Sequence, residues 1–251
     1  MFALLGSPST GAEGSAHRSL LAEAIGLGID GEGGCPHLEP NADESIDFLL
    51  TSAEHAGLPV DLHTDEHLDP ARVTLGALAD FVLRNNFRQP VTASHCVSLG
   101  IQPVDVQREI AEKVAAAGIS IVALPSTNLF LQGRQQQQAM PRALTAVAAL
   151  RDAGVNVCAG YDNLQDPFNP VGRGDCLETA SLMVSAAHLL PHDAYHSVSG
   201  AVRQAMRLPT AGVQPGNTAD LLLVPAQTTR ETIASAPSGR TVIRGGVVVS
   251  G

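Results

Sequence analysis

The chain has 251 residues, 44% of them apolar, which is enough for one large domain or for a barrel with a small appended part. Its 15 basic and 25 acidic side chains give a formal net charge of −10, which argues against binding to nucleic acid or to an anionic membrane surface. No apolar run reaches about 18 residues, and the first residues lack the basic start of a signal peptide. We therefore expect a cytoplasmic protein that acts on a small molecule.

Short apolar runs alternate with helical patterns over most of the chain. The predicted strands are residues 2–5, 28–35, 58–62, 91–94, 119–124 and 155–159. The run 28–35 is a poor strand by propensity, because it contains Asp30, Glu32 and several glycines, and we include it because two helices need a connection there. This alternation is typical of parallel strands joined by helices.

The helix expected between the strands at 28–35 and 58–62 has the clearest ends. Asn41 is placed to cap its first turn together with Glu44, and Gly57 is placed to end it. Further amphipathic helices are predicted around 75–82, over 106–118, from Pro141 to Gly154, and in the segments 175–189 and 193–206. Each of the helices up to Gly154 is expected to cover a strand.

Six parallel strands are three quarters of a (β/α)8 barrel, so we predict an α/β fold with an incomplete barrel over residues 1–207. The β-rich runs 220–224 and 241–249 predict a small C-terminal β-sandwich portion over residues 208–251. An open barrel exposes strand edges and an apolar interior. We therefore expect a homo-oligomer, or association through the open barrel.

Polar residues follow two of the predicted strands, about 100 residues apart: His63-Thr64-Asp65-Glu66 and Gly160-Tyr161-Asp162-Asn163. These are the residue types of a metal-dependent hydrolase. The 251 residues contain no His-x-His pair, however, and His63 with Asp162 supplies only two of the three or four ligands of a catalytic zinc or iron. The four cysteines have no C-x-x-C spacing and are expected to be reduced thiols.

Four stretches make the chain resemble the cytosine deaminase branch of the metal-dependent amidohydrolase superfamily over essentially its whole length. They are residues 61–66, 91–96, 128–134 and 156–163, the last followed by Asp166-Pro167-Phe168. The segments 215–221 and 244–246 match amidohydrolases in general. Members of this branch normally begin earlier, with β-sandwich strands and two barrel strands, the first of which carries the His-x-His metal pair. This chain starts at what resembles the third barrel strand.

The resemblance implies roles for individual residues. His63 and Asp162 would bind one divalent metal, zinc or ferrous iron, which supplies a hydroxide by lowering the pKa of bound water. Glu66 would protonate the ring nitrogen and carry a proton to the departing amine. His95 would hold and polarise the attacking water. All four residues are expected at the carboxyl ends of barrel strands, where barrel enzymes place their chemistry.

Asn163 and Gln132 are candidate contacts to the substrate or to the loops around it. The best-known cytosine deaminases carry a second acidic residue at the position of Asn163, and an amide both donates and accepts hydrogen bonds, whereas a carboxylate only accepts. Residues 6–10 stand where a glutamine of the family reads the pyrimidine edge. Cytosine is the leading substrate, and an isocytosine-like or creatinine-like ring amidine is the alternative.

Other readings stay open. Asp65 and His67 are expected to be solvated or to support the ligands from outside, and His37 either lines the pocket mouth or caps a strand end. The chain is either an active hydrolase, whose start lies upstream or whose missing strands come from another chain, or a truncated, catalytically silent fragment or half of a split enzyme.

Overall fold

The computed structural model describes residues 1–250. The chain forms two compact units. The first unit comprises Met1–Ala123 and Gln132–Val157, and the second comprises Leu124–Leu131 and Cys158–Gly251. The boundary expected between residues 207 and 208 stays a prediction.

The first unit is built on a parallel sheet. Its strands are β1 (Phe2–Leu5), β2 (Gly31–Gly34), β3 (Val60–Thr64), β4 (Val91–His95) and β5 (Ser120–Ala123). The sixth strand, β6 (Val157–Ala159), begins at Val157, the last residue of the first unit, and its other two residues belong to the second unit. The sheet order is β1-β2-β3-β4-β5-β6, which is the order of the sequence. The predicted α/β class with six strands is confirmed, and the run 28–35 is extended only over Gly31–Gly34.

Close packing explains why β2 is rich in glycine despite its poor strand propensity. A Cβ atom on Gly33 would lie 1.9 Å from the carbonyl oxygen of Asp61 on β3, and one on Gly34 would lie 2.6 Å from the side chain of Leu49. Side chains at these positions would displace the neighbouring strand and helix α2 (Ala42–Ala56). The tertiary contacts therefore select glycine here.

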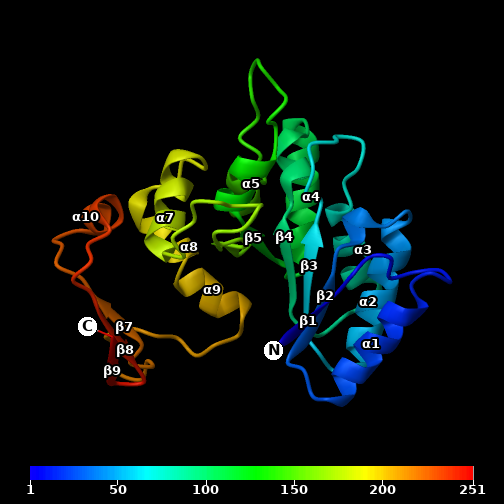
Figure 1. Ribbon diagram of the computed structural model, residues 1–251, viewed down its shortest axis with the longest axis horizontal. Coiled ribbons are helices and arrows are strands. Elements are labelled where there is room, and N and C mark those ends of the chain that lie inside the picture. The colour runs from blue at the N-terminus through cyan, green and yellow to red at the C-terminus, as the bar shows by residue number, and fades with distance from the viewer. Residues whose placement is uncertain (251) are drawn as a thin grey trace. The chain divides into compact units, whose positions relative to one another are not determined.

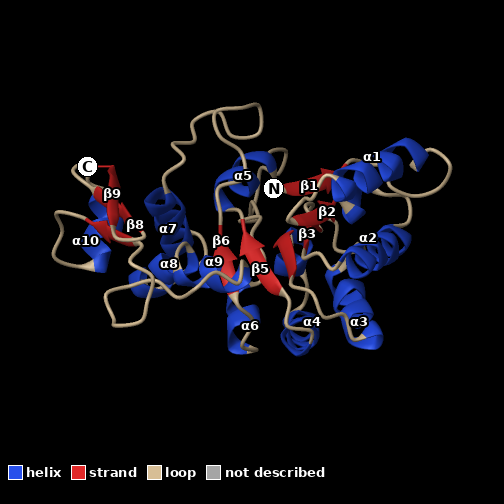
Figure 2. Cartoon of the chain, turned by 90° about the horizontal axis from the view of Figure 1, so that it is seen from below, coloured by secondary structure: helices blue, strands red, loops and turns tan. Residues whose placement is uncertain are grey.

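Helices cover the strands of the first unit. They are α1 (Ser15–Gly26), α2, α3 (Leu75–Asn85), α4 (Val104–Ala116) and α6 (Val147–Asp152), with the 3-10 turns η1 (Pro36–Leu38) and η2 (Val97–Ile101). Helices α1 to α4 follow one another along one side of the sheet (Figures 1 and 2). The predicted ends of α2 are confirmed, since the Asn41 side chain accepts from the Glu44 amide and Gly57 adopts a left-handed φ of 69°.

The helix predicted from Pro141 begins six residues later, at Val147. Ala143 has a left-handed φ of 53°, which a helix cannot contain. The backbone of this segment packs closely against η2, because a Cβ atom on Gly100 would lie 1.9 Å from the carbonyl oxygen of Leu144. Tertiary packing therefore holds residues 143–146 out of the helix.

The core of the first unit lies between the sheet and its helices. Its fully buried side chains include Leu49, Leu50, Leu62, Leu75, Leu78 and Ile121. Within residues 1–250, no helix combines the length and the apolar character that a membrane crossing requires.

The second unit is mostly helical and ends in a small sheet. Its elements are α5 (Pro125–Leu131), the rest of β6, α7 (Cys176–Ser185), α8 (Pro191–Ser197), α9 (Gly200–Ala205), β7 (Leu221–Leu223), α10 (Thr229–Ser235), β8 (Thr241–Arg244) and β9 (Val247–Ser250). Strands β7, β8 and β9 lie in the two C-terminal β-rich runs and pair antiparallel in a sheet of their own. Gly245 and Gly246 form the turn between β8 and β9, with φ values of 56° and 82°. All four cysteines are thiols that take no part in a disulfide, as the expectation of reduced cysteines requires.

Candidate metal and active site

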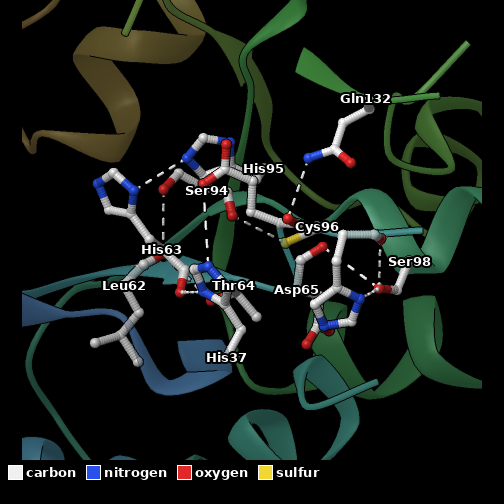
Figure 3. Close-up of polar contacts among 12 residues, drawn as sticks. His37, Leu62, His63, Thr64, Asp65, Ser94, His95, Cys96, Ser98 and Gln132 are labelled. Carbon is white, nitrogen blue, oxygen red and sulfur yellow. Dashed lines mark hydrogen bonds and ion pairs between the residues drawn. The ribbon is translucent and has the colours of Figure 1, made fainter. Parts of the chain in front are cut away.

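Pairing between β3 and β4 sets two histidines side by side at the carboxyl edge of the parallel sheet. The strands pair in parallel with Thr64 opposite His95, so β3 and β4 end at the same level of the sheet. The Cys96 amide donates to the Thr64 carbonyl over 2.8 Å, which extends this pairing past the strand ends. His95 is fully buried in a left-handed conformation, with φ 65°. Figure 3 shows its side chain and that of His63 directed toward each other.

His63, Glu66 and His95 form one cluster. The His95 Nε2 and His63 Nδ1 atoms are 3.0 Å apart, and His95 Nδ1 lies 3.5 Å from Glu66 Oε1. Taking one ligand atom from each residue, all three atoms lie within 4.8 Å of one another. Two imidazoles and a carboxylate are ligand types that zinc and ferrous iron accept. These side chains therefore fit a divalent transition metal.

Asp65 ties the turn after β3 to helix α3. Its carboxylate is fully buried and accepts from the amide and hydroxyl of Thr74 and from the Leu75 amide, over 2.6 to 3.0 Å. Of the two readings left open for Asp65, the buried carboxylate excludes the solvated one and agrees with a residue that supports the ligands from outside. The first turn of a helix has amides without partners inside the helix, and these donors make the burial of the carboxylate tolerable. Asp65 thereby fixes the backbone between His63 and Glu66.

His37 lies in η1, just beyond the end of the neighbouring strand β2. Its Nδ1 hydrogen-bonds the His63 carbonyl over 2.9 Å (Figure 3), and its Nε2 lies 4.0 Å from Glu66 Oε2. A carbonyl can only accept, so Nδ1 carries a proton. Of the two roles left open for His37, the contact to His63 is a cap on a strand end. The sequence offered one indication of this role, because His37 lies shortly after β2, at the edge of the sheet where β3 also ends.

Burial lowers the pKa of His37 below its ordinary value, and burial also lowers the pKa of His67. His67 Nδ1 lies 2.9 Å from the hydroxyl of Ser98, on η2. The Ser98 amide donates to the Asp65 carbonyl over 3.2 Å. Asp65 and His67 therefore support the turn that carries Glu66.

Gln132 contacts this turn from another segment. Its amide nitrogen donates to the Glu66 carbonyl over 3.2 Å, and Figure 3 shows the side chain reaching toward the cluster. The structure thus gives Gln132 a contact to a neighbouring loop, one of the two roles expected for it. A contact to substrate stays a prediction.

Asp162 and Asn163 belong to the second unit, in the loop that leaves β6 through Gly160 and Tyr161. Asp162 is exposed and adopts a left-handed φ of 69°. The Asn163 side chain accepts from the Thr127 hydroxyl over 3.1 Å and donates to Asp166 Oδ2 over 2.7 Å. The amide thus joins the loop to Thr127 on α5 and to Asp166 within the loop, so Asn163 orders the segment that follows Asp162. The metal role of Asp162 and the substrate role of Asn163 stay predictions.

The chain is similar in sequence to a deaminase and to a related hydrolase. Over 221 residues it is 38% identical to a pterin deaminase of Rhizobium rhizogenes, covering 86% of this chain and 51% of that protein. An N-isopropylammelide isopropyl amidohydrolase of Pseudomonas is 24% identical over 164 residues, which are 64% of this chain and 38% of that protein. The chain thus spans about half the length, or less, of these relatives.

Solved structures agree on the fold. A 5-methylcytosine deaminase from Klebsiella pneumoniae, liganded with 5-fluorocytosine, superposes with a TM-score of 0.88 at 31% identity, covering 99% of this chain and 62% of that one. The N-isopropylammelide isopropylaminohydrolase of Burkholderia multivorans superposes with a TM-score of 0.82 at 26% identity, over 98% of this chain and 61% of that one. The incomplete barrel expected from the sequence is confirmed by these similarities. Residues 4–249 match the model of the amidohydrolase family, and the chain therefore belongs to that family.

Proposed function

We propose that this chain carries the catalytic site of a metal-dependent hydrolase that deaminates cyclic amidines. The observation that carries the proposal is the cluster of His63, Glu66 and His95 at the carboxyl edge of the parallel sheet. The similarity to a pterin deaminase and to a 5-methylcytosine deaminase supports hydrolysis of a carbon–nitrogen bond outside peptides.

The substrate class follows from what the named relatives act on. Pterin and 5-methylcytosine both carry an amino group on a ring carbon next to a ring nitrogen. The pyrimidine ring of a pterin has the isocytosine arrangement, with the amine between two ring nitrogens. The 38% identity to the pterin deaminase therefore favours an isocytosine-like substrate, the alternative reading of Asn163, and cytosine is the second candidate.

Glu66 is placed to carry the protons of such a reaction. One carboxylate oxygen lies 3.5 Å from His95 Nδ1 and the other 4.0 Å from His37 Nε2. Its side chain is 19% exposed, so a ligand can reach it from solvent, whereas His95 is fully buried. In the proposed reaction His95 orients the attacking water, whose oxygen bonds to the ring carbon while the bond from that carbon to the amine breaks. Glu66 takes the two protons of the water in turn, and passes the first to the ring nitrogen and the second to the amine, which leaves as ammonia.

A divalent metal supplies the nucleophile by lowering the pKa of water. We assign His63 and Asp162 as two of its ligands, on the resemblance to cytosine deaminases. The surrounding protein is arranged to hold His63 in place, because His37 hydrogen-bonds its carbonyl and Asp65 fixes the turn that follows.

Cytoplasmic location, self-association and the absence of nucleic acid or membrane partners remain parts of the proposal.

The test is release of ammonia from isocytosine, pterin and cytosine by the purified chain, after loading with zinc or, without oxygen, with ferrous iron. We expect turnover of at least one ring amidine, and its loss in Glu66→Gln. The matched control is Glu54→Gln, which changes an exposed glutamate on α2 and should leave turnover unchanged. Absence of turnover of all three ring amidines with either metal would contradict the proposed function.

A further inference from the structure

We propose that residues 6–10, the loop that follows β1, select a fused two-ring substrate over a single ring, and that Glu39 is the residue that positions this loop. The inference rests on the proposed function, because it names the substrate class of the same site. Glu39 takes no part in the proton transfers and acts through the loop that it holds.

Strand register sets the distance between this loop and the cluster. Leu5 pairs with Gly34 and Gly34 pairs with Leu62, so β1 and β2 end beside the residue that precedes His63. Neighbouring strands are about 4.8 Å apart, and the loop therefore starts roughly 10 Å from His63. A single six-membered ring held at Glu66 is too short to span this distance, whereas a second fused ring extends toward the loop.

Glu39 holds the loop through a buried carboxylate. The Ser9 amide donates to Glu39 Oε1 over 2.6 Å, and the Thr10 hydroxyl donates to Oε2 over 3.5 Å. Ser9 is 3% exposed and Glu39 is 5% exposed. A buried carboxylate is costly unless hydrogen-bond donors surround it, so the loop and Glu39 fix each other's position.

Two helices draw the same loop back against the layer that covers the sheet. The Ser9 hydroxyl lies 2.8 Å from that of Ser45 on α2, and Arg18 on α1 donates to the Ser9 carbonyl over 2.9 Å. His17 Nδ1 donates to the Pro8 carbonyl over 2.8 Å. The loop is thus held against the helices, and none of its residues has a long side chain.

Burial around the cluster shows which side is open. On the β4 side of His63, residues 95–99 are all buried, whereas Gly6 and Ser7 are exposed. The Glu66 side chain is 19% exposed, so a ring can reach it from solvent. Within the first unit, a substrate larger than one ring therefore has room toward β1.

The turn η1 connects the loop to the reacting end of the site. The Nε2 atom of His37, in the middle of η1, lies 4.0 Å from Glu66 Oε2, and Glu39 follows η1 directly. One short segment thus contacts both the proton-transfer carboxylate and the loop. The distance between Glu66 and the loop, which decides the size of substrate accepted, is therefore fixed by η1 and Glu39.

Contact with a second ring affects binding more than chemistry. The loop lies far from the carbon that loses its amine, so its contact is the same in the bound substrate and in the transition state. Loss of such a contact raises KM and leaves kcat unchanged. Isocytosine, which has one ring, should not respond.

The experiment compares pterin and isocytosine as substrates of the full chain loaded with zinc. We expect the KM for pterin to rise about 10-fold in Glu39→Ala, because the buried Ser9 amide loses its acceptor, and the KM for isocytosine to change by less than about 2-fold. Glu39→Gln should restore the KM for pterin, because its amide oxygen still accepts from Ser9. The control is Ser52→Ala, which removes a hydrogen bond to Glu32 on β2 and should change neither KM.

A second variant does not depend on the hydrogen bonds of Glu39. Ser7 is exposed, so Ser7→Leu keeps the fold and fills the room for the second ring. We expect the KM for pterin to rise about 10-fold here as well, with no change for isocytosine. Cobalt(II) binding, followed by visible absorption, should be unchanged in Glu39→Ala and Ser7→Leu, which shows that the metal site is intact.

Equal increases in KM for the two substrates, or no increase for pterin, would overturn the inference. Binding of the two products needs no turnover, and these are the dioxo pteridine that pterin would yield and the uracil that isocytosine would yield. Calorimetry should show weaker binding of the dioxo pteridine in Glu39→Ala and Ser7→Leu, with uracil unchanged. This pattern without ammonia release would refute the proposed function and leave the inference standing, whereas failure of the unchanged chain to bind the dioxo pteridine would overturn it.

Discussion

The parallel sheet of the first unit and the small antiparallel sheet of the second differ in how deeply their strands are buried. Strands β2 to β4 are buried or partly buried along their whole length, and Leu62 in β3 is fully enclosed. Strand β9, by contrast, is exposed at all four residues, and Val248 is 61% exposed. Burial on both faces fixes the register of β3 and β4, and with it the meeting of His63 and His95. The small sheet depends on its turn and on polar contacts.

Truncation of a side chain in each sheet tests this contrast most strongly. Leu62→Ala leaves a cavity in the core and should lower the free energy of unfolding by about 2 to 5 kcal/mol. Val248→Ala removes atoms that are already largely in solvent, and should change it by less than about 0.5 kcal/mol. Urea denaturation of both variants measures the difference. Equal losses would contradict the view that the two sheets differ in packing.

The two units also carry acidic groups with opposite pH dependence. Glu32 on β2 is fully buried, one of its oxygens accepts only from Ser52, and burial raises its pKa to about 7. Asp175 in the second unit accepts two hydrogen bonds from Arg240, which lower its pKa.

For Glu32, the folded chain holds the proton more tightly than the unfolded chain. Its stabilising effect is complete below pH 4.5, the ordinary value of an unfolded glutamate, and is lost as the pH rises to about 7. The loss amounts to about 3 kcal/mol. We expect Glu32→Gln to remove this slope in urea denaturation between pH 5 and pH 8, with Glu54→Gln as the unchanged control. A slope that persists in Glu32→Gln would contradict the assignment. Asp175 behaves in the opposite way, because its stabilising effect is lost only as the pH falls below the ordinary value of 3.8.

Asp65→Asn tests the turn that carries Glu66. The amide keeps the shape of the carboxylate but loses the charge and one acceptor oxygen for the amides of α3, so we expect a loss of about 2 kcal/mol in the free energy of unfolding. The same variant should weaken cobalt(II) binding, because the turn between His63 and Glu66 loses its anchor. Asp47→Asn, at an exposed position on α2, is the control. If Asp65→Asn is less stable but binds cobalt as before, the contacts of Asp65 with the start of α3 stabilise the fold without positioning His63 and Glu66.

A smaller effect than those of Leu62→Ala, Glu32→Gln and Asp65→Asn is expected from Arg240→Ala. The guanidinium makes two hydrogen bonds to Asp175, of 2.9 and 2.7 Å, but both side chains are about one fifth exposed, so solvent screens the pair. We expect a loss of about 1 kcal/mol, measured by thermal unfolding, and no change in cobalt binding. A change in cobalt binding would show that the metal site is sensitive to the second unit.

Local signals predicted much of the architecture. The cap at Asn41 and the end at Gly57 define α2 from residues that lie in or next to it, and β1 matches its predicted bounds of residues 2–5. The predicted start of α6 is wrong, because helical periodicity shows neither the packing of this segment against Gly100 nor the left-handed conformation of Ala143.

The candidate site shows the same division. Motif order selected His63, Glu66 and His95, which the structure brings together. The buried state of Asp65, the contact of His37 with the His63 carbonyl and the bond from the Thr127 hydroxyl to Asn163 depend on partners elsewhere in the chain. Spacing along the sequence does not encode such partners.

The sequence by itself determined the parallel α/β class, the small C-terminal sheet, the residues that cluster at the strand ends and the family, because periodicity, caps and short motifs are local properties. Only the tertiary structure decided where α6 begins, why β2 consists of glycine and glutamate, and how near Glu66 lies to two histidines. These features depend on distances between segments that are far apart in the chain, and such distances are set by the register and packing of the folded sheet.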